Sequence, residues 1–156
     1  MGHKKSAVQP SARRPLALLV DDDPVMREVL RLTFEDAGWE VAEAADARGA
    51  LDGIRCLNPH LITLDLVMPL NEGFHSVDLI QALNEEVPDT LLIVISAHSG
   101  QQPIQTFFRD REVPVLSKTN LDKPWLKKLL VEIRQELESA SSQQQADSTG
   151  LNKGDN

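Results

Sequence analysis

The chain has 156 residues, of which 41% are hydrophobic and 4% aromatic, with one cysteine, no tyrosine and a net charge of −8. This length fits one domain, and the lone Cys56 excludes both a disulfide framework within the chain and a multi-cysteine zinc site. The absence of a signal peptide or an apolar run of about 18 residues predicts a cytoplasmic protein without a membrane span, and the acidic balance argues against direct nucleic-acid binding.

The two ends of the chain differ in composition from its centre. Residues 1–14 contain four basic residues and no acid, without hydrophobic periodicity, which predicts a flexible basic arm. Residues 139–156 are mostly polar, and a segment with so little apolar surface cannot offset the entropy of ordering. We therefore expect a disordered polar tail at 139–156 and one folded domain at 15–138.

Within residues 15–138, short apolar runs alternate with segments of helical periodicity. Strands are predicted at residues 16–20, 39–42, 61–64, 91–95 and 113–116, the last on a sheet edge because it contains Pro114. Helices are predicted between Pro24 and Gly38, around Ala47–Ile54 (where Cys56 is expected to be buried), around 77–83, weakly around 104–108, and from Trp125 or Leu126 to Leu137. Unbroken apolar strands separated by helices predict a parallel sheet that is covered on both faces.

Charged or hydroxyl-bearing residues follow four of the predicted strands. Asp21 and Asp22 come directly after the first strand, and Asp65 comes directly after the third. Ser96 follows the fourth strand and Lys118 the fifth. Ligands of open α/β sheets bind at the carboxyl ends of the strands, so these side chains are expected to border one crevice if the first and third strands are neighbours.

This set of residues fits phosphoryl-transfer chemistry. Carboxylates that lie together repel one another unless a cation offsets them, and oxygen ligands suit Mg²⁺ or Mn²⁺. Asp65 would then act as a nucleophile that forms an acyl phosphate, as aspartate does in some ATPases. Lys118 and Ser96 would hold the phosphoryl oxygens.

The chain resembles the response-regulator receiver domain of two-component signalling over about residues 15–138. The matching segments are L-A-L-L-V-D-D-D-P at 16–24, L-I-T-L-D-L-V-M-P at 61–69, L-L-I-V-I-S-A at 91–97 and V-L-S-K at 115–118. The resemblance implies a flavodoxin-like (βα)5 fold, doubly wound around a five-stranded parallel sheet of order 2-1-3-4-5.

The resemblance also implies roles for single residues. Asp65 would be the phosphoacceptor, and Mg²⁺ or Mn²⁺ would be held by Asp22, Asp65 and the backbone carbonyl of Val67, with Asp21 nearby or acting through water. Ser96 would be the switch hydroxyl and Lys118 the phosphate partner. The implied partners are a sensor histidine kinase or histidine phosphotransfer protein and an unidentified downstream protein, and a homodimer is compatible with the family.

Two positions depart from the usual pattern of the family. Thr119 stands where proline commonly follows the lysine, which predicts a trans peptide bond and a different placement of Lys118. Val115 stands where an aromatic residue commonly reorients when the switch hydroxyl moves. These departures affect the expected switch rather than the phosphorylation chemistry.

The leading hypothesis is therefore a phosphorylation-dependent signal receiver that catalyses only its own phosphoryl transfer and dephosphorylation. One alternative is a receiver-like binding module that does not depend on phosphate, which Val115 and Thr119 favour and the retained acids oppose. The other is an Mg²⁺-dependent aspartyl-phosphate phosphohydrolase. Enzymes of that kind usually need a second acid two residues after the nucleophile, where this chain has Val67.

Overall fold

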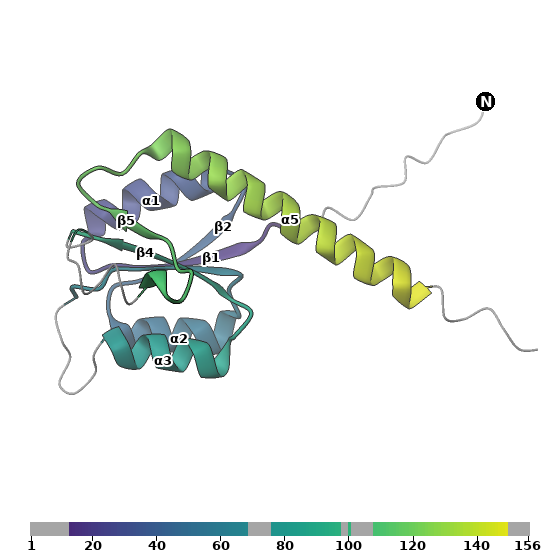
Figure 1. Cartoon of the computed structure of the whole chain (residues 1–156), viewed down its shortest axis with the longest axis horizontal. Helices are drawn as coiled ribbons and strands as arrows, with labels where there is room; N and C mark the ends of the chain where they lie inside the picture. The colour runs from purple at the N-terminus through teal and green to yellow at the C-terminus, as the bar shows by residue number, and fades with distance from the viewer. Residues whose placement is uncertain (1–12, 69–75, 98–99, 101–107, 150–156) are drawn as a thin grey trace, which may run out of the picture.

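The protein is a three-layer α/β structure in which helices cover both faces of one parallel sheet (Figure 1). The computed structural model describes residues 13–68, 76–97, 100 and 108–149. Its elements in chain order are β1 (Leu16–Val20), α1 (Pro24–Asp36), β2 (Glu40–Ala44), α2 (Ala47–Leu57), β3 (Leu61–Leu64), α3 (Ser76–Glu86), β4 (Leu91–Ser96), β5 (Val115–Ser117) and α5 (Lys123–Thr149). The predicted helix around 104–108 lies mostly outside the described residues.

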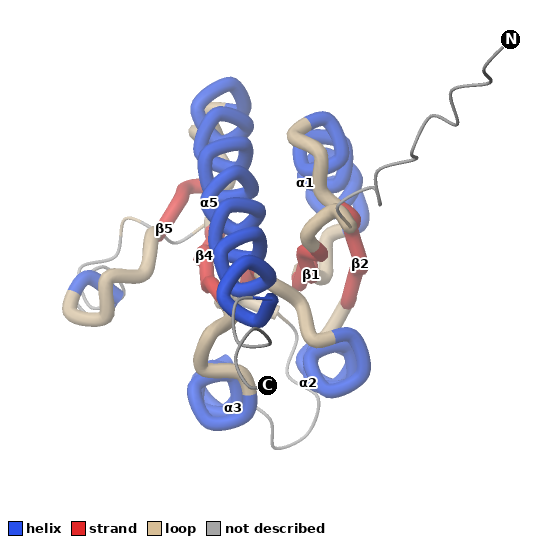
Figure 2. Tube along the Cα trace, turned by 90° about the vertical axis from the view of Figure 1, so that its right-hand side faces the viewer, coloured by secondary structure: helices blue, strands red, loops and turns tan. Residues whose placement is uncertain are grey.

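The sheet has the predicted order β2-β1-β3-β4-β5, and each neighbouring pair of strands is parallel. Viewed from the side, α1 and α5 lie over one face and α2 and α3 over the other (Figure 2). The α/β doubly wound fold is thus confirmed. The order matters for function because β1 and β3 are neighbours, which brings the acids that follow them to the same point.

Each face of the sheet has its own hydrophobic core because successive strand residues point to opposite faces. Ala17 and Leu19 of β1 pack with residues of α1 and α5, whereas Leu18 and Val20 pack with residues of α2 and α3. Burying four consecutive β1 side chains explains the unbroken apolar run in the sequence.

Helix α1 begins directly after the acids and is fixed at both ends. The Asp23 carboxylate caps it by accepting from the Val25 N–H at 2.9 Å, and Pro24 occupies the first helical position. Gly38 follows its end with a φ of +90°, a conformation that favours glycine. The indole N–H of Trp39 then donates to the Leu130 carbonyl at 3.0 Å, which ties α5 to the end of α1.

Helix α5 differs from the prediction at its C-terminal half. Leu126 and Leu130 are fully buried and anchor it, while the neighbouring Trp125 is 47% exposed. The helix continues to Thr149, so the prediction of a disordered tail is wrong for residues 139–149. Once a helix is anchored, each further residue adds a hydrogen bond without a new nucleation cost. Figure 1 shows this half extending beyond the sheet.

Two smaller details also depart from the sequence analysis. Cys56 is exposed, because Ile54 takes the buried position of α2 and a residue two places further faces away from it. The last strand starts two residues later than predicted, because the Val113 N–H bonds to the Phe108 carbonyl and Glu112 turns the chain with a φ of 56°. Its edge position is confirmed.

Candidate functional site

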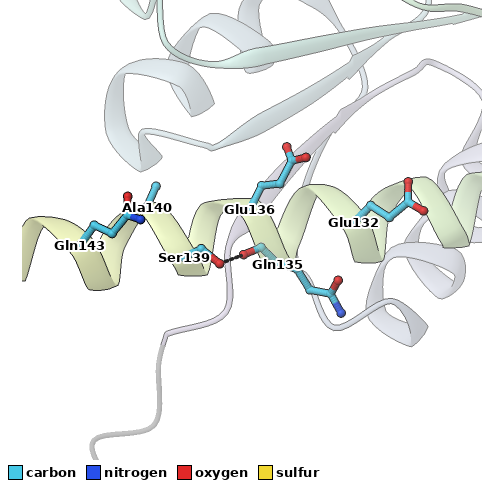
Figure 3. A pocket seen from close by; sticks show the side chains of 6 residues that line it. All are labelled: Glu132, Gln135, Glu136, Ser139, Ala140 and Gln143. Carbon is cyan, nitrogen blue, oxygen red and sulfur yellow. Dashed lines mark hydrogen bonds between the residues drawn. The ribbon is translucent and has the colours of Figure 1, made fainter.

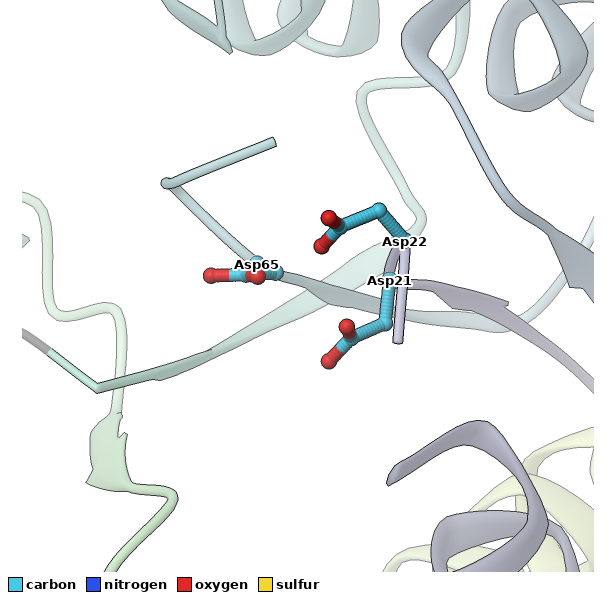
Figure 4. Close-up of side chains that lie close together, drawn as sticks. All are labelled: Asp21, Asp22 and Asp65. Carbon is cyan, nitrogen blue, oxygen red and sulfur yellow. The ribbon is translucent and has the colours of Figure 1, made fainter. Parts of the chain in front are cut away.

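Three aspartates meet where β1 and β3 end. Val20 and Leu64 are paired in the sheet, so the next residues, Asp21 and Asp65, leave neighbouring strands side by side. Together with Asp22, they bring carboxylate oxygens within 4.8 Å of one another (Figure 4). Asp21 and Asp65 are only 2% and 3% exposed, whereas Asp22 is open to solvent. The cluster therefore has a buried floor and an accessible side.

Lys118 extends into this cluster from the end of β5. Its backbone N–H donates to the Ser96 carbonyl at 3.2 Å, which holds the β5 end against β4. Its Nζ lies 2.7 Å from Asp21 Oδ2 and 2.7 Å from Asp65 Oδ2, with the side chain 14% exposed. One ammonium group thus bridges the two buried carboxylates.

Both buried acids divide their two oxygens in the same way. One oxygen of each contacts Lys118, and the other accepts a backbone N–H two residues later. Asp21 Oδ1 accepts from the Asp23 N–H at 2.9 Å, and Asp65 Oδ1 accepts from the Val67 N–H at 3.1 Å. These bonds fix the orientation of both carboxylates before any ligand binds.

The charges in this cluster do not balance. Burial disfavours the charged form of Asp21 more than the contacts with Lys118 and Asp23 favour it, and repulsion from Asp65 adds to this, so the pKa of Asp21 lies above its ordinary 3.8. Burial also disfavours the Lys118 charge, but its hydrogen bonds to Asp21 and Asp65 outweigh this and raise the pKa of Lys118 above 10.5. Burial is thus the main cause of the Asp21 shift, whereas contact with two carboxylates is the cause of the Lys118 shift.

The residues present fit a hard divalent cation. The cluster offers only oxygen donors, and Mg²⁺ typically takes one or two protein carboxylates and keeps several waters. The exposed side at Asp22 leaves room for those waters. The added positive charge would also balance the excess that remains after Lys118 is counted.

Of the other predicted site residues, Ser96 and Val115 lie in β4 and β5, and Val67 follows β3. Ser96 is the last residue of β4 and is fully buried, and it is linked to Lys118 through its carbonyl. Val67 is 52% exposed, and its backbone N–H touches Asp65. Val115 is half-buried and packs against the core on the α2 and α3 face.

The substitution at Thr119 does not displace the lysine. No cis peptide bond occurs in the described part of the chain, as predicted, and Lys118 nonetheless reaches Asp65. The different placement of Lys118 that Thr119 predicts therefore does not keep its ammonium group from the acids. Thr119 Oγ1 instead lies 2.8 Å from Ser117 Oγ, so the residues directly before and after Lys118 contact each other.

Sequence reasoning missed one residue at the cluster. Arg27 is half-buried in α1, and its Nη1 donates to the backbone carbonyl of Asp21 at 2.7 Å. A weak signal was present, because a cation near the N-terminus of a helix opposes the helix dipole. A basic residue at such a position indicates a nearby acceptor or acid that compensates for the unfavourable interaction.

A hollow on α5 is not a candidate for this chemistry. It is lined by Glu132, Gln135, Glu136, Ser139, Ala140 and Gln143 (Figure 3). All six residues belong to one helix, and the Ser139 hydroxyl is bonded to the Gln135 carbonyl at 2.9 Å. The aspartate cluster, in contrast, brings together side chains that follow β1, β3 and β5. None of the helices in the described part of the chain is apolar enough to cross a membrane.

Comparisons with known proteins identify relatives of this arrangement. The chain is 38% identical over 86 residues to the chemotaxis protein CheY of Thermotoga maritima, a match that covers 54% of this chain and 68% of that protein. It is 39% identical over 88 residues to the C4-dicarboxylate transport transcriptional regulatory protein DctD of Pseudomonas aeruginosa, covering 56% of this chain and 18% of that protein. The chain spans less than half the length of DctD and of MtrA, a DNA-binding response regulator of Mycolicibacterium smegmatis.

Solved structures and a family model agree with these relatives. The CheY-like response regulator receiver domain protein of Methanospirillum hungatei has the same fold, with a TM-score of 0.69 at 20% identity over 82% of this chain and 99% of that one. The receiver domain of AraT from Geobacillus stearothermophilus gives a TM-score of 0.68 at 25% identity over 83% and 99%. The model of the response regulator receiver domain matches residues 17–131. The chain belongs to the receiver domain family of two-component response regulators.

Proposed function

We propose that this receiver domain accepts a phosphoryl group on Asp65 from a histidine kinase or a histidine phosphotransfer protein, and signals through protein contacts. The observation that carries the proposal is the Lys118 ammonium group, which lies 2.7 Å from both Asp21 and Asp65. A nucleophile that is oriented but negatively charged needs such a cation, because the incoming phosphoryl group is also negative.

The proposed step is an in-line displacement at phosphorus. An Asp65 carboxylate oxygen forms a bond to phosphorus while the P–N bond of the phosphohistidine breaks, and the electron pair of that bond returns to the imidazole nitrogen. The product is an acyl phosphate on Asp65. Attack by water on the same phosphorus later releases inorganic phosphate and restores the carboxylate, so the domain catalyses only its own modification and its reversal.

The chain's own residues divide the work. Lys118 holds one Asp65 oxygen, and the Val67 N–H holds the other, which orients the nucleophile. Asp21, Asp22, Asp65 and the Val67 carbonyl are the proposed ligands of Mg²⁺ or Mn²⁺, which when bound shields the negative charge on the transferred oxygens.

The response to phosphorylation would start at contacts that the new group displaces. A phosphoryl group on Asp65 would compete for the Lys118 ammonium group, whose backbone is bonded to the Ser96 carbonyl. We propose Ser96 as the switch hydroxyl at this junction. Because Val115 replaces the usual aromatic residue, the change at β5 would be read out by packing of a smaller side chain.

Two alternatives make different demands on the same site. A phosphate-independent binding module is favoured by Val115 and Thr119, but it gives no reason for a lysine bridge between two buried acids. A phosphohydrolase would need a general acid two residues after Asp65, and Val67 has an apolar side chain there. The receiver reading accounts for the complete cluster.

The test is phosphorylation by acetyl phosphate with Mg²⁺, followed by intact mass measurement. Wild type should gain one phosphoryl group, and Asp65→Asn should gain none. Asp36→Asn, at the exposed end of α1, is the matched control and should behave as wild type. A phosphorylated Asp65→Asn would refute the assignment of Asp65. If wild type gained no phosphoryl group from acetyl phosphate or from a panel of histidine kinases, the binding-module alternative would replace the proposal.

A further inference from the structure

The turn between β1 and α1 has to hold two acids in a fixed relation. The peptide unit that joins Asp21 to Asp22 determines how the buried carboxylate and the exposed one face each other. The Asp21 N–H donates to the Ala44 carbonyl at 3.1 Å, so the start of this turn is still bound to β2. The Asp21 carbonyl lies on the peptide unit between the acids, and it receives the Arg27 guanidinium at 2.7 Å.

Arg27 is placed to reach this carbonyl by the helix itself. Its backbone N–H donates to the Asp23 carbonyl at 3.0 Å, so it stands one turn after the cap. Side chains of a helix lean toward its N-terminus, which directs Arg27 back over the turn. A hydrogen bond from a charged donor is stronger than one between neutral groups, and it restrains the carbonyl more firmly.

The position has an electrostatic cost that the contact explains. A cation near the start of a helix opposes the helix dipole. A neutral polar residue would avoid that cost but lacks a charged donor. The negative charge of the aspartate cluster offsets the unfavourable interaction with the dipole.

We infer that Arg27 is a positioning residue for the proposed Mg²⁺ site, where it fixes the peptide unit between Asp21 and Asp22. The inference rests on the proposed function, because it requires that these acids bind the metal. Arg27 would not touch the metal or the phosphoryl group. It would act through the backbone that carries two of the ligands, as groups behind metal ligands do elsewhere.

Replacing Arg27 with a neutral residue distinguishes a positioning role from a purely electrostatic one. If Arg27 acted through its charge alone, a neutral residue would remove a repulsion and Mg²⁺ would bind more tightly. If Arg27 positions the turn, Mg²⁺ would bind more weakly despite the lost repulsion. The direction of the change in affinity therefore distinguishes the two roles.

The experiment is calorimetric titration of the metal-free protein with MgCl₂. We expect Arg27→Met and Arg27→Gln to bind Mg²⁺ about tenfold more weakly than wild type, because neither side chain restores a charged donor at the Asp21 carbonyl. Arg27→Lys, which can donate to the same carbonyl, should recover most of the affinity. Two neutral variants keep the test open if one of them does not fold.

Controls separate this inference from general destabilisation. Arg31→Met makes the same change one turn further along α1, where the guanidinium contacts Glu28 and Glu35, and should leave the affinity unchanged. Urea unfolding without metal reports stability separately. A folded Arg27→Met that binds Mg²⁺ as tightly as wild type, or more tightly, overturns the inference.

A reference variant distinguishes failure of the inference from failure of the metal site. Asp22→Asn removes a proposed ligand and should weaken Mg²⁺ binding whatever Arg27 does. If Asp22→Asn weakens binding and Arg27→Met does not, only the positioning role is wrong. If neither variant changes the affinity, the metal site itself is wrong, and the inference falls with it.

Discussion

The two ends of the sheet differ in the side-chain contacts that hold their loops. At the amino end, where the strands begin, the Leu16 N–H donates to His60 Nδ1 at 3.0 Å and the Thr90 hydroxyl donates to the Pro59 carbonyl at 2.9 Å. At the carboxyl end, Lys118 bridges two buried carboxylates that outnumber it. Each of these two contacts at the amino end pairs one donor with one acceptor, whereas the carboxyl end leaves a charge imbalance.

This difference separates stability from function within one sheet. A neutral hydrogen bond contributes about 1 kcal/mol to stability and needs no counter-charge. A buried carboxylate without a full counter-charge weakens the fold, but it remains ready for a cation or for chemistry. The same strands thus hold their loops firmly at one end and present a reactive group at the other.

The largest effect should come from removing the bridging cation. Lys118→Met leaves Asp21 and Asp65 buried without an ammonium group, and we expect about 3 kcal/mol less stability at neutral pH in chelator. Urea unfolding measures this loss. Mg²⁺ should restore part of it, because the metal would replace the missing positive charge.

A matched control is Lys127→Met on α5. Lys127 pairs with Asp36 at the surface, where both side chains are well exposed. Exposed ion pairs contribute little, so the loss there should be under about 1 kcal/mol. Equal losses in Lys118→Met and Lys127→Met would show that the carboxyl end is no more strained than the surface.

The next effect concerns Asp21 and pH. The pKa of Asp21 is raised, so the folded state holds its proton more tightly than the unfolded state does. This carboxyl group therefore lowers the free energy of unfolding as pH rises from 3.8 through the raised pKa. In chelator, Asp21→Asn should gain stability relative to wild type over that interval. A difference that is constant with pH would contradict the raised pKa.

The features that the sequence predicts are those that follow from pattern. Residues 16–20 and 61–64 are strands in the prediction and in the structure, because each is an apolar run that ends at an aspartate. The meeting of Asp21 with Asp65 follows from the strand order. The Arg27 contact and the helical residues 139–149 have no such pattern, since one depends on where a side chain reaches and the other on propagation from an anchored helix.

The middle of the sheet contains one group that neither end explains. Thr63 on β3 is 1% exposed, and its hydroxyl has no hydrogen-bond partner in the residues that the structure describes. Its sheet neighbours are Leu19 and Ile93. Thr63→Val keeps the shape and removes the unpaired group, so thermal unfolding should show a gain of about 1 kcal/mol.

Thr33→Val is the control for this substitution. The Thr33 hydroxyl donates to the Val29 carbonyl at 2.9 Å, so the same change there removes a bond that exists. It should give no comparable gain. A loss of stability in Thr63→Val would mean that the hydroxyl has a partner, such as a buried water, that contributes to the fold.

At the amino end, a smaller loss is expected from His60→Leu. The substitution removes the acceptor of the Leu16 N–H, which is in an exposed setting, so about 0.5 kcal/mol should be lost in urea unfolding. His60→Asn offers a carbonyl oxygen at a similar reach and should recover the loss. If the two variants were equally unstable, the hydrogen bond would not be what His60 contributes.

The smallest effect should come from the ion pair that joins α2 to α3 near the amino end. Two nitrogens of Arg55 contact the two oxygens of Glu86 at 2.8 and 2.7 Å, and this contact lowers the pKa of Glu86 from 4.5. The stability that Glu86 adds is therefore present above pH 4.5 and is lost as pH falls through the lowered pKa. Glu86→Gln should be slightly less stable than wild type at pH 7 and equal to it in acid. Glu85→Gln is the control, because Glu85 contacts only the neutral Gln81 among the hydrogen bonds described.

Added salt should shrink the difference in stability between Glu86→Gln and wild type at pH 7, since Arg55 and Glu86 are both exposed to solvent. A difference that survives both acid and salt would mean that the amino end also relies on charge, and the contrast between the two ends of the sheet would have to be abandoned.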